Sequence, residues 1–138
     1  MRVFVDTNLL LDVLAKRAPF YDDAARIWTL AELGKIEALV SAISFNNVYY
    51  VVRRASNRKS AEQALQLMRN VFIPVPLSVQ ILSQAMDAGF NDFEDAIQFH
   101  SAVHADARCL ITRDADHFPV TNIPIITPAG FLASLAPE

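Results

Sequence analysis

The chain has 138 residues, 53% of them hydrophobic, and a formal net charge of −3. This length predicts one domain over residues 1–138, and the apolar content is sufficient for one large core. The negative charge argues against a protein that coats nucleic acid through bulk positive charge, although it leaves open an enzyme that acts on nucleic acid.

Strand and helix patterns alternate along the chain. A short buried strand at 2–6 precedes helices at 9–16 and 21–35, and a second strand is predicted at 37–41. The later elements are helices from about 45 to 55 and at 60–71, a short or edge strand at 73–76, helices at 79–88 and 93–105, strands at 109–112 and 123–127, and a closing helix at 129–135. This alternation predicts a three-layer α/β/α sandwich with a mainly parallel central sheet.

Three features bear on where the protein works. Met1 and Arg2 lead directly into a strand pattern, so we expect no signal peptide, and no segment has the roughly 18 uninterrupted apolar residues of a membrane-spanning helix. Cys109 is the one cysteine, so no internal disulfide can form. We therefore expect a soluble, cytoplasmic protein with no membrane partner.

Acidic side chains recur where predicted strands end. Asp6 closes the first strand, and Asp114 follows the strand at 109–112. Carboxyl ends of parallel strands share one edge of a sheet, and the helix at 93–105 must run antiparallel to them, so Asp95 returns to that edge. Backbone N–H groups at the start of this helix are expected to favour the ionised form of Asp95.

A cluster of carboxylates at this edge predicts a divalent metal. Two carboxylates about 4 Å apart repel by roughly 4 kcal/mol at an effective dielectric constant near 20, so the cluster is hard to keep ionised without a cation. Carboxylate oxygens with no His or Cys at liganding spacing favour Mg²⁺ or Mn²⁺ over zinc. His100 and His104 lie more than one helical turn beyond Asp95, away from the edge.

Each acid also has an ordinary explanation. Asp6 could cap a helix, and Asp92 with Asp95 could form a capping pair. Asp114 and Asp116 could make Asx turns. The joint metal-site interpretation is favoured because none of these local roles requires the acids to share an edge.

The residues at this edge resemble a known family. In order and spacing, Asp6-Thr7-Asn8, Asp92-Phe93-Glu94-Asp95-Ala96 and Ile111-Thr112-Arg113-Asp114 are similar to the motifs of PIN domains, in particular the toxin ribonucleases of the VapC type. The resemblance spans essentially the whole chain. It implies a metal-dependent endoribonuclease. We expect single-stranded or loop RNA as the substrate, because a flexible, unpaired backbone reaches a recessed carboxylate cluster more easily.

The resemblance also implies roles and partners. Asp6, Asp95 and Asp114 match the catalytic acids that hold Mg²⁺ or Mn²⁺. A homodimer is implied and, for a toxin, a small inhibitory antitoxin protein. The auxiliary positions are Asp116, Asp92, Asn47, Thr7, Asn8 and Thr112.

One position departs from the family pattern. The family usually has a glutamate in the first turns of the helix after the second strand, and Asn47 aligns there. An amide can coordinate a cation but carries no charge, so the site loses one negative charge. Glu37 precedes its strand at the opposite edge, and Glu94 is turned about 100° around its helix from Asp95, so neither is expected to replace the missing acid.

The missing acid leaves an alternative function open. In this alternative the chain is a PIN-fold module with little or no nuclease activity that binds RNA or a protein partner. A phosphatase with an aspartyl nucleophile is less favoured, because that chemistry usually needs a second aspartate two residues after the first, where this chain has Asn8.

Basic side chains are candidates for RNA contact. Arg113 is one, although the acid that follows it could equally be its ion-pair partner. Arg53 and Arg54 are two others, and with Arg58 and Lys59 they place four cations within seven residues. This basic stretch could be a contact surface for phosphates or for an acidic partner, or simply a solvated helix end.

Overall fold

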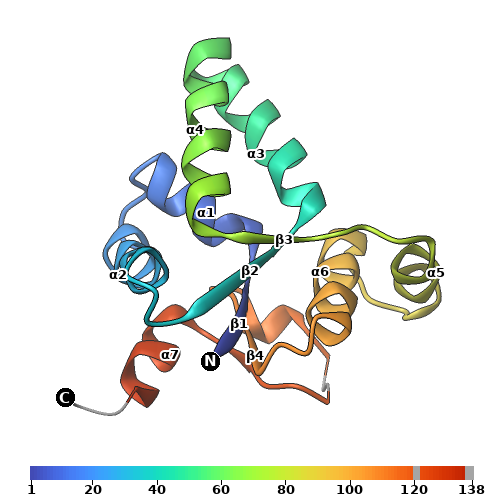
Figure 1. The fold of residues 1–138 in the computed structure, drawn as a ribbon. Coiled ribbons are helices and arrows are strands. Elements are labelled where there is room, and N and C mark those ends of the chain that lie inside the picture. Colours follow the sequence, from blue (N-terminus) through green and yellow to red (C-terminus); the bar gives the residue numbers. More distant parts are fainter. Residues whose placement is uncertain (120–121, 136–138) are drawn as a thin grey trace.

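A parallel five-stranded sheet forms the centre of the structure, a computed structural model that describes residues 1–119 and 122–135. The strand order is β3-β2-β1-β4-β5, and every neighbouring pair is parallel. The strands are β1 (Arg2–Val5), β2 (Glu37–Ser41), β3 (Ile73–Val75), β4 (Cys109–Ile111) and β5 (Ile125–Ile126). Figure 1 shows helices on both sides of this sheet, which confirms the predicted three-layer α/β/α sandwich.

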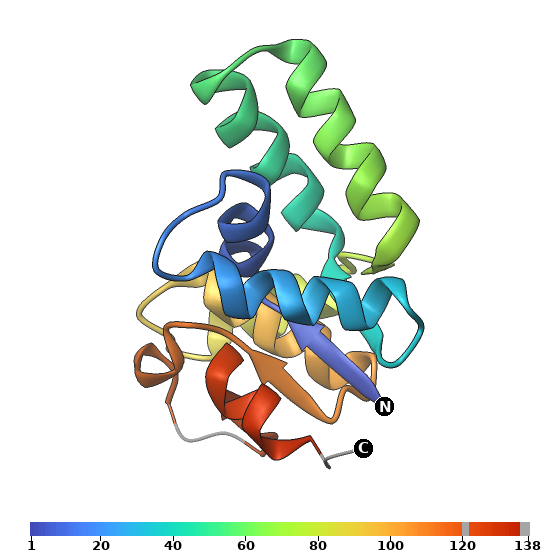
Figure 2. The same ribbon diagram turned by 90° about the vertical axis from the view of Figure 1, so that its left-hand side faces the viewer.

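Helices α1, α2 and α7 cover one face of the sheet, and α6 covers the other, with α5 packed against the outer side of α6 (Figure 1). Helices α3 and α4 form a hairpin that projects away from the rest of the chain (Figure 2). None of the helices in the described ranges is long and apolar enough to cross a membrane. The helices are α1 (Thr7–Leu14), α2 (Tyr21–Glu32), α3 (Ala42–Ala55), α4 (Arg58–Val71), α5 (Val79–Asp87), α6 (Phe93–His104) and α7 (Pro128–Ser134), with a short 3-10 helix η1 (Ala115–His117).

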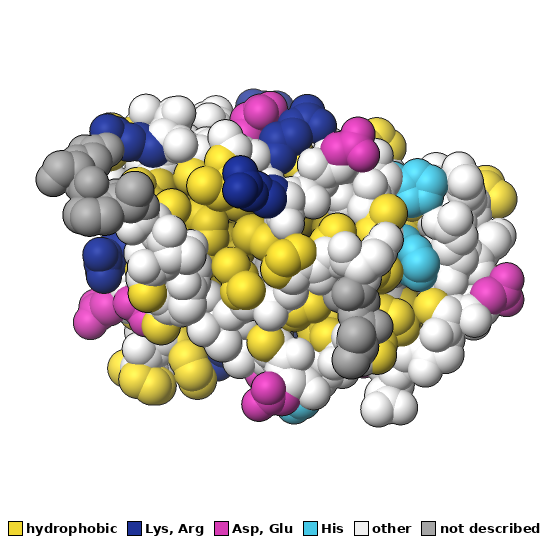
Figure 3. All heavy atoms as spheres, turned by 90° about the horizontal axis from the view of Figure 1, so that it is seen from below, with side chains coloured by type: hydrophobic (Ala, Val, Ile, Leu, Met, Phe, Trp, Pro, Cys, Tyr) yellow, Lys and Arg dark blue, Asp and Glu magenta, His cyan; other side chains and the backbone are white. Residues whose placement is uncertain are grey.

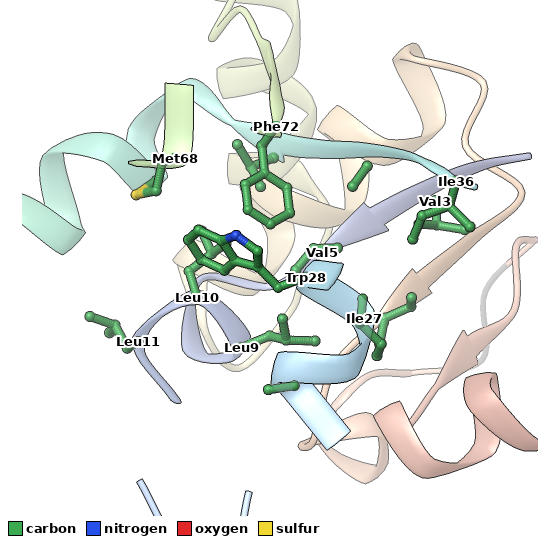
Figure 4. Close-up of a cluster of buried hydrophobic side chains, with 14 of the residues drawn as sticks. Val3, Val5, Leu9, Leu10, Leu11, Ile27, Trp28, Ile36, Met68 and Phe72 are labelled. Atoms are coloured by element: carbon green, nitrogen blue, oxygen red, sulfur yellow. The ribbon is translucent and has the colours of Figure 1, made fainter. Parts of the chain in front are cut away.

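Alternate residues of β1 point into opposite cores. Val3 and Val5 pack beneath α1 and α2, whereas Phe4 packs in the core beneath α6. In the first core, Trp28 and Phe72 meet edge to face with their ring centroids 4.8 Å apart (Figure 4). Because both faces of the sheet are covered, a ligand can approach β1 only at the ends of the strands.

Local signals explain most of the helix starts. Polar side chains at the N-cap positions accept hydrogen bonds from backbone N–H groups in the first turn, as expected for capping. The prolines of β3 predicted an edge strand, and β3 does lie at one edge of the sheet. The capping residues are Ser41, Asn57, Ser78, Asp92 and Thr127.

Several boundaries differ by one to three residues from the sequence prediction. Helix α1 begins at Thr7, two residues earlier than predicted, because the chain turns into the helix directly after Asp6. Strand β5 has only two residues, Ile125 and Ile126, where a strand over 123–127 was predicted. It lies at the sheet edge opposite β3, where it has β4 as its neighbour.

The side of the molecule at which β1 begins carries no concentration of acids among its described residues. Viewed from below in Figure 3, this face shows hydrophobic side chains surrounded by dispersed acidic and basic groups. Glu37 lies at this edge, where its carboxylate is 3.5 Å from the Nε atom of Arg2. Glu37 is therefore at the opposite edge from Asp6, as predicted.

Candidate functional site

Asp6 is the buried residue around which the candidate site is arranged. It follows β1 at the carboxyl edge of the sheet and is 3% exposed. Its Oδ2 atom accepts a hydrogen bond of 2.7 Å from the hydroxyl of Thr112, and its N–H donates to the carbonyl of Ile111. Asp6 occupies the N-cap position of α1, but its side chain makes no capping hydrogen bond. The carboxyl group is held by the segment at the end of β4 instead.

The loop after β4 brings Asp114 to the same edge. The Thr112 hydroxyl that donates to Asp6 also accepts a 3.1 Å hydrogen bond from the N–H of Asp114. Asn8 donates from Nδ2 to Oδ2 of Asp114 at 3.5 Å, a long hydrogen bond. Asp116 lies exposed in η1, and its auxiliary role stays a prediction.

Asp95 lies in the first turn of α6, as predicted. The side chain of Asp92 caps this helix by accepting a 3.0 Å hydrogen bond from the N–H of Asp95. Burial, followed by the negative charges of Asp92, Asp6, Glu94 and Asp114, raises the pKa of Asp95 to about 7. The N–H groups at the helix N-terminus were predicted to favour the ionised form of this carboxyl, and burial and the neighbouring negative charges act against it.

Burial also raises the pKa of Asp6. Hydrogen bonds from Thr112 and Gln98 act in the opposite direction, and the charge of Asp114 adds to the increase. Asp6 and Asp95 come from different elements, and they lie close enough for the charge of Asp6 to raise the pKa of Asp95. The end of β1 and the start of α6 were predicted to lie at the same edge of the sheet, and an interaction between the two charges agrees with that prediction.

Two buried polar residues support the site and were not identified from the sequence. Gln98, which is 1% exposed, accepts a 3.1 Å hydrogen bond from the N–H of Thr7. Ser44 shares a 2.7 Å hydrogen bond between its hydroxyl and that of Thr7. The available signal was spacing, since Gln98 follows Asp95 by three residues and therefore shares its helix face.

Glu94 reaches the position at which the sequence lacks an acid. The amide of Asn47 donates a 2.9 Å hydrogen bond from Nδ2 to Oε1 of Glu94. Burial raises the pKa of Glu94, hydrogen bonds from Asn47 and Thr7 lower it, and the charge of Asp6 raises it further. Glu94 was expected to need an unusual reach to replace the missing acid, and its side chain does extend from α6 to Asn47 of α3.

Arg113 pairs with Asp12, and not with the acid that follows it in the chain. Its Nε atom lies 3.5 Å from Oδ2 of Asp12, a carboxylate in α1 that is 2% exposed, and Arg17 lies 3.8 Å from the other oxygen. The Arg113 guanidinium also lies 4.0 Å above the ring of Phe20, in cation–π geometry. These contacts join the loop after β4 to α1, and an RNA contact by Arg113 stays a prediction.

The other basic candidates lie on the projecting hairpin. Arg53 and Arg54 are exposed in the last turn of α3, at the far end of the hairpin seen in Figure 2. Arg58 forms a 2.8 Å ion pair with Glu62 one turn along α4. Contact between RNA and Arg53 or Arg54 also stays a prediction.

The chemistry of the donor set suits a hard divalent cation. The carboxylates of Asp6, Asp95 and Asp114 offer oxygen ligands, as Mg²⁺ and Mn²⁺ prefer. As the side chains stand, however, no three His, Cys, Asp or Glu residues within 1–119 and 122–135 are grouped closely enough to hold a metal ion. Ligation requires side-chain movement, and the assignment of these three residues as ligands stays a prediction.

The fold and the site define an α/β/α protein with acidic groups at the carboxyl edge of a parallel sheet. The PIN domain family matches residues 2–116, and the chain belongs to this family. The chain is also 22% identical over 135 residues to Ribonuclease VapC1 of Aquifex aeolicus, a match that covers 94% of this chain and 92% of that protein.

Solved structures share the fold. A toxin–antitoxin complex from Klebsiella pneumoniae has a TM-score of 0.66 and 22% identity, covering 91% of this chain and 97% of that one. VapC20 of Mycobacterium tuberculosis, a sarcin–ricin loop cleaving toxin, has a TM-score of 0.65 and 15% identity, covering 78% of this chain and 86% of that one. At these identities the likeness shows the fold alone.

The raised pKa of Asp95 predicts a pH-dependent stability. The pKa rises from 3.8 to about 7 on folding, so the folded state binds more protons between about pH 4 and pH 7. The contribution of Asp95 to stability therefore falls as the pH rises through that window. We expect Asp95→Asn to raise the thermal unfolding midpoint at pH 8 more than at pH 4, measured with a chelator present.

The matched control is Asp87→Asn, which changes an exposed carboxylate at the end of α5. This control should shift the midpoint equally at the two pH values. If Asp95→Asn also shifted it equally, the raised pKa would be wrong.

Thr112→Val tests the support of Asp6. The substitution removes the hydroxyl that donates to Asp6 and accepts from the N–H of Asp114, so the buried carboxylate loses one of its donors. We expect the free energy of unfolding to fall by about 1–3 kcal/mol, measured by urea titration. Thr29→Val is the control, since its hydroxyl donates to Ala25 on an exposed surface, and should cost no more than about 0.5 kcal/mol. Equal losses in both variants would contradict the supporting role of Thr112.

Proposed function

We propose that this chain is a Mg²⁺- or Mn²⁺-dependent endoribonuclease that cleaves single-stranded or loop RNA. The proposal is supported chiefly by the Thr112 hydroxyl, which donates to Asp6 and accepts from the N–H of Asp114, and by the negative charges of Asp6 and Asp114, which raise the pKa of Asp95. Membership of the PIN domain family and the similarity to Ribonuclease VapC1 support the same activity.

In this proposal Asp6, Asp95 and Asp114 hold the cation. When bound, such a cation lowers the pKa of a water molecule and neutralises charge at the attacked phosphate. Thr112 orients Asp6 through its hydroxyl and positions the backbone of Asp114 through the same oxygen. Gln98 fixes the backbone of the residue after Asp6 by accepting from its N–H.

The substrate class follows from the depth of the site. Asp6 is almost fully buried, and a flexible, unpaired RNA backbone can reach a recessed carboxylate more easily than a rigid duplex can. We assign Arg53, Arg54 and Arg113 as candidate contacts to RNA phosphates.

We also propose that the chain is the toxin of a toxin–antitoxin pair and binds a small antitoxin protein. Support comes from the Klebsiella pneumoniae complex and from VapC20, whose folds this chain shares. A homodimer and a cytoplasmic location belong to the same proposal.

The alternative, a module without nuclease activity, depended on the missing acid at Asn47. The hydrogen bond between Asn47 and Glu94 places a carboxylate beside that position, which weakens the reason for expecting inactivity.

The proposal predicts cation-dependent cleavage of unstructured RNA by the purified protein. Asp95→Asn and Asp114→Asn should each lower the cleavage rate by roughly 100-fold or more, because each removes a charged ligand. A fluorescently labelled single strand, incubated with Mg²⁺ or Mn²⁺ or with a chelator, reports the rate.

Asp87→Asn serves here too as the control and should cleave at the wild-type rate. Equal cleavage by wild type and Asp95→Asn, or full activity in the chelator, would refute the assigned site.

A further inference from the structure

We propose that Glu94 supplies a fourth carboxylate to the cation site and takes the place of the acid that is missing at position 47. This inference rests on the proposed function, since it assigns a residue to the same site. It rests on three observations, namely the direction in which α3 faces, the contacts of Glu94 and the chemistry of Asn47.

The first turns of α3 face the segment after Asp6. Ser44 is joined by a 2.7 Å hydrogen bond to the hydroxyl of Thr7, the residue that follows Asp6. Asn47 lies three residues after Ser44 and therefore projects from the same side of α3. A ligand from α3 would enter the site from this side, so position 47 is correctly placed although its side chain is uncharged.

Glu94 enters the same space from α6. Its Oε1 atom accepts the 2.9 Å hydrogen bond from the Asn47 amide, and its carboxyl group also has a hydrogen-bond interaction with Thr7. The Glu94 carboxyl thus lies between α3 and the residue next to Asp6. Its neighbour Asp95, in the same helical turn, is the proposed ligand from α6.

The chemistry of the two residues is complementary. The amide of Asn47 donates to the Glu94 carboxylate, whereas a glutamate at position 47 would put two negative charges in contact. The pair therefore carries one negative charge, the same charge that a single glutamate on α3 would bring. The number of acids around the proposed cation is restored to four by Asp6, Glu94, Asp95 and Asp114.

A purely structural role is the competing explanation, in which the Asn47–Glu94 hydrogen bond only ties α3 to α6. Glu94→Gln separates the two roles, because a glutamine oxygen still accepts from the Asn47 amide but carries no charge. A hydrogen bond with a purely structural role would persist after this change. If Glu94 is a metal ligand, the affinity of the site for the cation would fall.

The test is calorimetric titration of the purified chain with Mn²⁺. We expect Glu94→Gln to raise the Kd by about tenfold or more, as Asp95→Asn should, with little change in the thermal unfolding midpoint measured without Mn²⁺. Glu37→Gln is the matched control, because it removes a carboxylate at the opposite edge, and should bind as wild type does. The double variant Asn47→Glu with Glu94→Gln moves the charge back to α3 and should recover most of the lost affinity.

The outcomes distinguish this inference from the proposed function. Wild-type Mn²⁺ affinity in Glu94→Gln, together with weak binding by Asp95→Asn, would overturn the role of Glu94 and leave the nuclease proposal standing. Weak binding by Glu94→Gln without recovery in the double variant would overturn the equivalence of positions 47 and 94. A wild-type protein that binds no Mn²⁺ would overturn both proposals.

Discussion

Burial of the Asp6 carboxyl group at the end of β1 is the constraint on which the rest of the site depends. Removal from water favours the neutral acid, and the hydrogen bonds from Thr112 and Gln98 oppose this effect. Thr112 follows β4 and Gln98 belongs to α6, so the groups that support Asp6 also join the sheet edge to the helix that carries Asp95. The position of the buried Asp6 side chain is therefore linked to the positions of Asp95 and Asp114.

The acids at this edge repel one another, and neutral polar groups separate them. Asn8 donates to Asp114, and Asn47 donates to Glu94, so an amide faces a carboxylate in both places. Each amide supplies a donor without adding a negative charge near Asp6, Glu94 and Asp95, whose pKa values are already raised. A divalent cation would relieve the remaining repulsion, which is why the electrostatics and the proposed cofactor agree.

The sequence was sufficient for the architecture but not for the details of the site. Strand β2 and the start of α6 were predicted correctly because hydrophobic runs and capping residues are local signals, and the connection rules of parallel sheets then placed Asp6, Asp95 and Asp114 at one edge. The approach of Glu94 to Asn47 was missed because it depends on side-chain torsions and on where the fold places α3 relative to α6. The high pKa of Asp95 was missed for a similar reason, since burial is a property of the assembled fold.

The cation site is tested most directly by locating Mn²⁺ in crystals of the wild-type chain by anomalous scattering. We expect one or two peaks at the carboxyl edge, with oxygens of Asp6, Asp95 and Asp114, and of Glu94, at about 2.0–2.3 Å. Mn²⁺ bound elsewhere, or the absence of any peak beside these carboxylates at saturating Mn²⁺, would contradict the proposed cation site.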